Sequence, residues 1–294
     1  RSDRKLNYEG FIGVDWSGAK GPNLPGLQVA FAEPGNKSPH LVKPREGRWW
    51  SRRSFVQWLI GELRHHRLLI GADFAFGYPL ADEGAFFPGL KFQPKTAATL
   101  WDLVEKYTGP DTNFYGADFY KRQDLEFHRY YLSPYGKGDR YRFRQRLTEI
   151  ACSAITAPHP VLKCIGAANV GTGSLAGMRI LRYLSIEMPE SLSIWPFKQP
   201  TKNSGIVEVF PRLYFKLANT DPSSWQNREN INQTLAFYKS EKLSDQIEIY
   251  REDEADALVS AAALRLLSSD EELWSAPKSF ETAIKAEGWI FGVK

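Results

Sequence analysis

Four aspartates occupy positions where a buried element ends or begins. Asp15 and Asp73 each close a short apolar run that predicts a buried strand. Asp253 and Asp256 stand at the start of a segment rich in Ala and Leu that predicts a helix. They are three residues apart, a spacing that puts both on one face of that helix. A buried carboxylate is costly unless it is paired or used, so these four side chains could converge on one site.

Converging carboxylates would have a defined chemistry. They repel one another and raise each other's pKa unless a cation is bound. Carboxylate oxygens suit Mg²⁺ or Mn²⁺, and two such ions about 3.5–4 Å apart stabilise the attacking and leaving oxygens of phosphoryl transfer. Each aspartate also has a structural explanation as a turn residue, a helix cap or a complement to the helix dipole.

The segments around these acids predict an α/β protein. Strands are expected at 11–15, 27–32, 40–43, 68–73 and 205–210. Helices are expected at 52–67, 95–107, 175–183, 230–239 and 254–267, with Asp253 as the N-cap of the last. Residues 148–155 fit either a helix or a strand, and 288–293 fit a last strand or a packed tail.

We expect the 294 residues to form one domain. Its core would comprise 9–79 and 200–294, with a mixed central sheet flanked by helices. Residues from about 80 to 199 would be a large, mostly irregular or helical insertion, because periodicity is weak there and Gly, Pro and aromatic residues are frequent.

The net charge of +4 is concentrated in one part of this insertion. The segment 118–146 holds eight basic and four acidic residues, so the rest of the chain is neutral overall. Four of the bases alternate along the chain, as they would on one side of a strand. They are Arg140, Arg142, Arg144 and Arg146. We interpret them as possible phosphate contacts for nucleic acid, the alternative being a solvated face.

Ten aromatic residues are interleaved with these bases between 114 and 143. Aromatic rings beside basic residues suit single-stranded nucleic acid, whose bases stack on rings. An insertion of this size also needs a hydrophobic core of its own, and Tyr can keep a polar end in water. We expect most of these rings to be core residues.

The order of these elements and acids resembles the ribonuclease H fold, in particular its Holliday-junction resolvase (RuvC-like) branch. More closely, four motifs resemble family 429 of the domains of unknown function. These are Gly-Val-Asp-Trp-Ser-Gly at 13–18, Ala-Asp-Phe-Ala-Phe-Gly-Tyr-Pro at 72–79, Val-Glu-Val-Phe-Pro at 207–211 and the helix that opens with Asp253. The terminal Glu-Gly-Trp-Ile at 287–290 also resembles the end of that family.

The resemblance implies a ribonuclease H-like core and a metal-dependent nuclease that uses Mg²⁺ or Mn²⁺. It assigns metal-binding and catalytic roles to the four acids Asp15, Asp73, Asp253 and Asp256. The resolvase branch usually carries Glu where Asp73 stands, so a shorter side chain must serve here. Glu208 has no counterpart among the resolvase acids and is a secondary candidate.

Two other functions remain open. Actin-like ATPases and phosphotransferases share this fold and begin with a similar strand, but they duplicate it. The similar pentapeptides that begin at Ile12 and Ile70 lie too close together for a duplicated domain. The other possibility is a binding protein that kept the fold and lost the metal site, since fold does not settle function.

Composition excludes several classes of protein. The two cysteines, at 152 and 164, cannot form a disulfide framework or a Cys-rich zinc site. No apolar run approaches the roughly 20 residues of a membrane span, and no apolar signal core follows residues 1–5. We therefore expect a cytoplasmic protein without a membrane partner. DNA versus RNA, endo versus exo cleavage and oligomeric state stay open.

Overall fold

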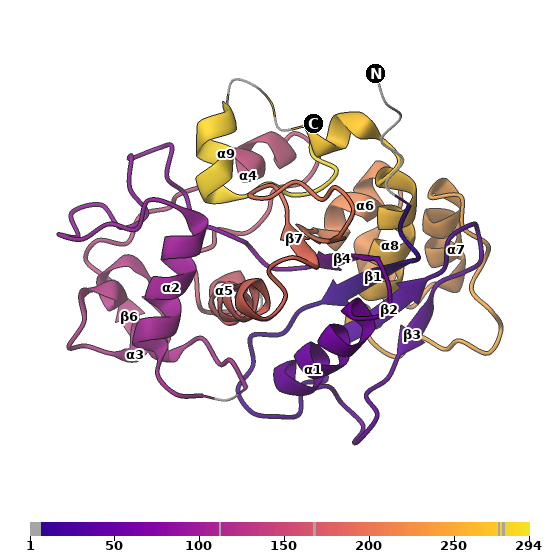
Figure 1. Cartoon of the computed structure of the whole chain (residues 1–294), viewed down its shortest axis with the longest axis horizontal. Helices are drawn as coiled ribbons and strands as arrows, with labels where there is room; N and C mark the ends of the chain where they lie inside the picture. The colour runs from indigo at the N-terminus through magenta and orange to yellow at the C-terminus, as the bar shows by residue number, and fades with distance from the viewer. Residues whose placement is uncertain (1–6, 112, 167–168, 276, 278–279) are drawn as a thin grey trace.

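The computed structural model describes residues 7–111, 113–166, 169–275, 277 and 280–294. The charged start of the chain, residues 1–5, lies outside these ranges. A six-stranded mixed sheet runs through the centre of the protein (Figure 1). Its order is β3-β2-β1-β4-β8-β7. The strands are β1 (Gly10–Asp15), β2 (Gln28–Ala32), β3 (His40–Val42), β4 (Leu68–Ala72), β8 (Ser204–Glu208) and β7 (Leu192–Ile194).

Strand directions determine which chain segments meet at one edge. β1, β4, β8 and β7 are mutually parallel, whereas β2 is antiparallel to β1 and to β3. β3 therefore also runs in the direction of β1. The residues that follow β1, β3, β4 and β8 consequently emerge at the same edge of the sheet, the carboxyl edge of the parallel strands.

Helices cover both faces of the sheet, in three layers (Figure 1). Side chains alternate along β1: Ile12 and Val14 belong to one core, and Phe11 belongs to the other. The first core includes residues of α1 (Arg52–Leu63), α2 (Ala97–Thr108) and α5 (Val170–Glu187). The second includes residues of α6 (Pro211–Leu217), α7 (Arg228–Phe237) and α8 (Glu252–Leu267).

The segment between β4 and β8 contains most of the remaining elements. They are α3 (Asp118–Lys121), a 3-10 helix (Glu126–Tyr130), the hairpin of β5 (Leu132–Ser133) and β6 (Gly136–Lys137), and α4 (Leu147–Cys152). Outside that segment, a 3-10 turn (Pro222–Ser224) precedes α7. A second 3-10 turn (Glu271–Trp274) and α9 (Glu281–Glu287) follow α8. The buried aromatics of 114–143 join the same core as α1 and the sheet.

The α/β class and the mixed sheet flanked by helices agree with expectation. The sequence did not reveal β7 or α6, and β7 brings residues expected in the insertion into the central sheet. Residues 148–155 begin in the helix α4, and the chain end is a packed tail with one bridge from Ile290 to Glu208. Asp253 is not the N-cap of α8: the helix begins at Glu252, and Arg251 caps it without a side-chain hydrogen bond.

Candidate active site

The sheet edge brings the aspartates together. Asp15 is the last residue of β1, and Asp73 directly follows β4, the parallel neighbour of β1. The backbone N–H of Asp73 donates to the carbonyl of Val14 at 3.0 Å, so the two strand ends are locked in register. Asp253 and Asp256 lie in the first turns of α8, which packs along β1.

A close approach between β1 and α8 sets the position of the helix. A Cβ atom placed on Gly13 would lie 2.2 Å from the carbonyl oxygen of Ala257 and 2.6 Å from the backbone nitrogen of Ala261. The strand and helix backbones are therefore nearly in contact, which only glycine facing small residues permits. This explains why α8 is rich in alanine where it crosses the strand.

The aspartates interact strongly with one another. Burial raises the pKa of Asp15 well above its usual value, and the charges of Asp256, Asp73 and Asp253 raise it further. The carboxyl of Asp15 is within hydrogen-bonding reach of both Asp253 and Asp73. Burial and the charge of Glu208 raise the pKa of Asp73 to about 7. Adjacent ionised carboxylates repel, so this cluster must share protons or bind a cation near neutral pH.

Asp256 completes the cluster. Burial raises its pKa well above the usual value, followed by the charges of Asp73, Glu252 and Asp253, while Arg212 acts in the opposite direction. All four sequence-predicted aspartates thus influence one another although they come from three separate elements. We call Asp15, Asp73, Asp253 and Asp256 the aspartate cluster.

The donors fit a hard divalent cation, because they are all carboxylate oxygens. Within the described part of the chain, however, no three His, Cys, Asp or Glu side chains are arranged so that they could hold a metal ion as they stand. The carboxyl groups instead approach one another, as groups that share protons do. Metal binding would therefore require the cluster to release those protons and the side chains to turn toward the ion.

A cleft of about 680 Å³ opens beside the cluster. Asp73, Asp256 and Glu252 contribute acidic groups to its lining. Arg212, at the start of α6, and His159 contribute nitrogen donors to the lining, and residues at the beginning of α5 line the same cleft. The cleft thus offers both carboxylates for a cation and a guanidinium for an anion.

Trp16 and Gly18 connect this cleft to α5. The indole N–H of Trp16 donates to the carbonyl of Gly173 at 3.0 Å. A Cβ on Gly18 would lie 2.5 Å from the backbone nitrogen of Gly173, so the loop after β1 packs directly on the first turn of α5. The segment expected as an insertion therefore forms one wall of the cleft.

Glu208 lines the cleft but is already paired. Arg146 donates from Nη1 to Oε2 of Glu208 at 2.8 Å and from Nη2 to Oε1 at 2.6 Å. The backbone N–H of Phe76 also donates to this carboxylate. Arg146 further donates to Glu149, and all three charged side chains are buried. Glu208 therefore serves to hold the interior together, and its charge acts on Asp73 from a fixed position.

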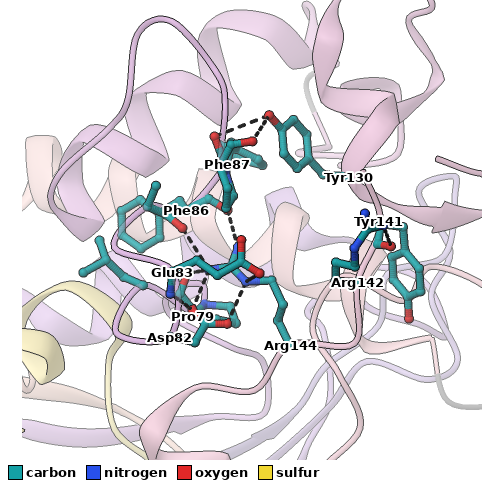
Figure 2. Close-up of polar contacts among 12 residues, drawn as sticks. Pro79, Asp82, Glu83, Phe86, Phe87, Tyr130, Tyr141, Arg142 and Arg144 are labelled. Atoms are coloured by element: carbon teal, nitrogen blue, oxygen red, sulfur yellow. Dashed lines mark hydrogen bonds and ion pairs between the residues drawn. The ribbon is translucent and has the colours of Figure 1, made fainter. Parts of the chain in front are cut away.

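The bases expected to contact phosphates have different environments. Arg146 is committed to Glu208 and Glu149, as described. The side chain of Arg144 is 4% exposed and donates to both carboxylate oxygens of Asp82. Figure 2 shows this guanidinium enclosed by the loop that contains Pro79 and Phe86, whose carbonyls accept from it. Neither group is free to bind an anion.

Arg140 and Arg142 differ from that pair. Arg140 is half-buried and donates to the hydroxyl of Tyr130 at 2.8 Å. Arg142 is exposed and donates to the backbone of Asp139 and Tyr141, next to which it is drawn in Figure 2. The alternating strand expected here is absent: the described residues 140–146 have no strand.

Most of the charge surplus of 118–146 is neutralised within the fold. Six of its eight bases lie within 4 Å of a carboxylate: Lys121, Arg122, Arg129, Arg140, Arg144 and Arg146. Five of its aromatic rings are buried: Phe119, Tyr120, Phe127, Tyr130 and Tyr131. The expectation that most rings belong to the core is confirmed for these, and the segment offers little free positive charge.

Arg212 and His159 were not found from the sequence. Burial and the charges of Lys163 and Arg212 lower the pKa of His159, so its imidazole is neutral near pH 7 and able to accept a proton. A signal for Arg212 existed, since it closely follows β8 at the edge where Asp73 follows β4. His159 follows α4 in irregular structure, where no periodicity marks it.

Comparisons of the chain with protein families, with curated proteins and with solved structures return no match. None of the helices in the described ranges is both long enough and apolar enough to cross a membrane.

Proposed function

We propose that the protein is a metal-dependent nuclease that hydrolyses phosphodiester bonds at the aspartate cluster. One observation carries this proposal: four aspartates from β1, β4 and α8 meet beside a cleft, where burial and the charges of neighbouring aspartates raise the pKa of Asp15 and of Asp256. A cluster of this kind is unfavourable in its ionised form unless a cation neutralises it. Such an arrangement is typical of a site that binds metal for phosphoryl transfer.

Different residues would bind the cation, bind the phosphate and accept a proton. Asp15, Asp73 and Asp256 would hold Mg²⁺ or Mn²⁺, and Asp253 would be a further ligand or would orient the attacking water. When bound, the cation would withdraw negative charge from the phosphate and lower the pKa of a water molecule. Arg212 would bind a phosphate oxygen across the cleft. His159, neutral near pH 7, would be available to accept the proton of the attacking water.

We further propose that the core belongs to the ribonuclease H type and that the chain is related to family 429 of the domains of unknown function. Support comes from strand order and direction: three antiparallel strands, β3-β2-β1, continue into the parallel strands β4 and β8. The acids stand at the ends of β1 and β4 and at the start of the last long helix, the positions on which the resemblance rests.

Cleavage assays test the activity. Purified protein is incubated with labelled single-stranded and duplex DNA and RNA, in Mg²⁺, in Mn²⁺ and in EDTA. We expect cleavage that requires the cation and falls at least about 100-fold in Asp15→Asn, because a ligand of the reacting centre is lost. Asp245→Asn is the matched control, since the side chain of Asp245 is fully exposed and does not line the cleft.

Two results would contradict the proposal. One is the absence of cation-dependent cleavage of every substrate while the protein remains folded, which would favour a non-catalytic binding protein. The other is equal cleavage by wild type and Asp15→Asn, which would point to a contaminating nuclease. ATP hydrolysis without cleavage of nucleic acid would favour the actin-like alternative.

A further inference from the structure

Positive charge at the carboxyl edge is available in a place that the sequence did not indicate. We propose that Arg48 and Arg251, both held against the indole of Trp49, bind backbone phosphates of a nucleic acid strand that passes over the aspartate cluster. This inference rests on the proposed function, because it names where the substrate lies beyond the cleft. It assigns the nucleic acid strand to the side of the aspartate cluster on which β3 lies.

Topology places these residues beside the cluster. β3 runs parallel to β1, so the loop of residues 43–50 leaves the sheet at the edge where Asp15 ends β1. Arg251 immediately precedes α8, whose first turns carry Asp253 and Asp256. β3 lies two strands from β1, on the side opposite β4 and β8, whose ends line the cleft. A nucleic acid strand that is bound both in the cleft and at Trp49 must therefore cross the aspartate cluster.

Specific contacts attach the loop to the start of α8. Lys43 forms an ion pair with the buried Glu254 at 3.2 Å. Arg251 donates from Nε to Oδ2 of Asp253 at 3.1 Å, which links the proposed phosphate site directly to the cluster. The carbonyl of Trp50 accepts from the backbone N–H of Leu24 at 2.9 Å. The loop is therefore fixed in place before any substrate binds.

Trp49 orients the two guanidinium groups. The Cζ atoms of Arg48 and Arg251 lie 4.8 and 5.7 Å from the centre of its ring, within the range of cation–π attraction. Trp49 is half-buried and Arg48 is exposed. Holding a guanidinium on a ring reduces the conformational entropy that it loses when it binds an anion.

These groups keep unused hydrogen-bond donors. Within the described residues, Arg48 has no carboxylate within 4 Å and donates no side-chain hydrogen bond, and Arg251 uses only Nε. Arg144 and Arg146, in contrast, donate from every nitrogen of the guanidinium. Oriented guanidinium groups with unused donors outside the cleft suit the regularly spaced phosphates of a polynucleotide, which they would bind without reading sequence.

Binding measurements on the full chain test this surface separately from catalysis. Fluorescence anisotropy is recorded in EDTA with labelled oligonucleotides of about 12 nucleotides, as single-stranded DNA, duplex DNA and RNA. We expect Arg48→Gln to weaken binding of the preferred form about five- to tenfold and to reduce the slope of log K against log salt by about one. Trp49→Leu should cause a similar loss of affinity, because it frees both guanidinium groups.

Two other arginines serve as comparisons. Arg64→Gln is the matched control, because Arg64 is an exposed arginine that ends α1 at the opposite edge of the sheet. Arg142→Gln tests the position first expected from the sequence. Both variants should bind oligonucleotides as wild type does. A loss in Arg142→Gln with none in Arg48→Gln would overturn the proposal, as would the absence of oligonucleotide binding.

A small substrate separates this inference from the proposed function. Bis(p-nitrophenyl) phosphate carries a single phosphate, which the aspartate cluster would hold, so none is left for Arg48 and Arg48→Gln should hydrolyse it at the wild-type rate in Mn²⁺. Hydrolysis that depends on Asp15, together with oligonucleotide binding that ignores Arg48, would overturn the surface and leave the nuclease function standing. Oligonucleotide binding that depends on Arg48, without any hydrolysis, would support the surface and contradict the nuclease function.

Discussion

Asp15 at the end of the first strand and Asp253 in the first turn of the last long helix lie within hydrogen-bonding reach of each other. The contact joins β1 to the start of α8 at the carboxyl edge of the sheet. Two carboxyl groups at this separation share a proton or a cation when they are stable. Several measurements can decide which of the two holds this site together.

The first prediction concerns pH in the absence of metal. The folded-state pKa of Asp73 is about 7, above its unfolded value of about 3.9. Between these two pH values the folded state therefore binds more protons than the unfolded state. The stability that the Asp73 carboxyl contributes is fully present below about pH 4 and is lost as the pH rises to about 7. Asp73→Asn should remove about 1.4 kcal/mol per pH unit from this slope.

Urea denaturation in EDTA at a series of pH values checks this effect. Asp73→Asn should be more stable than wild type near neutral pH and approach it in acid, while Asp245→Asn follows wild type throughout. A wild-type free energy of unfolding that rises across this range, with Asp73→Asn less stable than wild type at neutral pH, would contradict the shared-proton description of the cluster.

The second prediction concerns metal binding without a catalytic assay. At about pH 8, one unit above the pKa of Asp73, this carboxyl is largely ionised. Mn²⁺ or Mg²⁺ should therefore stabilise the fold, by about 2.7 kcal/mol at 100 times the dissociation constant. Thermal unfolding should show a rise in Tm that saturates with cation and is absent from Asp15→Asn. An equal rise in both proteins would mean that the cation binds elsewhere.

The third prediction separates Glu208 from the aspartate cluster. Arg146→Met leaves Glu208 and Glu149 buried without their cation and should cost about 3–5 kcal/mol of stability. Glu208→Gln should also destabilise the protein, yet it should keep the rise in Tm caused by Mn²⁺. If Glu208→Gln abolishes that rise while the protein stays folded, Glu208 is a metal ligand after all.

The fourth prediction tests the contact that positions α8. Gly13→Ala places a methyl group against the helix backbone and should cost about 1–3 kcal/mol. It should also weaken stabilisation by Mn²⁺, because α8 carries two of the aspartates. Gly61→Ala in α1 is the matched control: a Cβ there meets no atom within 4 Å, so it should stabilise the protein by about 0.5–1 kcal/mol.

Sequence patterns were sufficient for much of the fold and for the acids of the site. Periodicity over a few residues predicts three elements that carry the acids: the apolar runs before Asp15 and Asp73 and the Ala-rich segment after Asp253. These segments form β1, β4 and α8. The acids stand at the ends of these elements, so their meeting followed once the strands were parallel. The short strand β7 has too few residues for its periodicity to be detected.

Only the tertiary structure decided which charges remain free. Arg144 and Arg146 belong to a basic segment of the sequence, but folding pairs them with Asp82, Glu149 and Glu208 and buries them. Arg48 and Arg251 are far apart along the chain, yet they lie on the same indole. An ion pair forms between residues that are close in space, whatever their separation along the chain, and a buried charge without such a partner is costly. The local sequence therefore specifies where charged residues stand along the chain. The packing of distant segments determines which of them can bind a ligand.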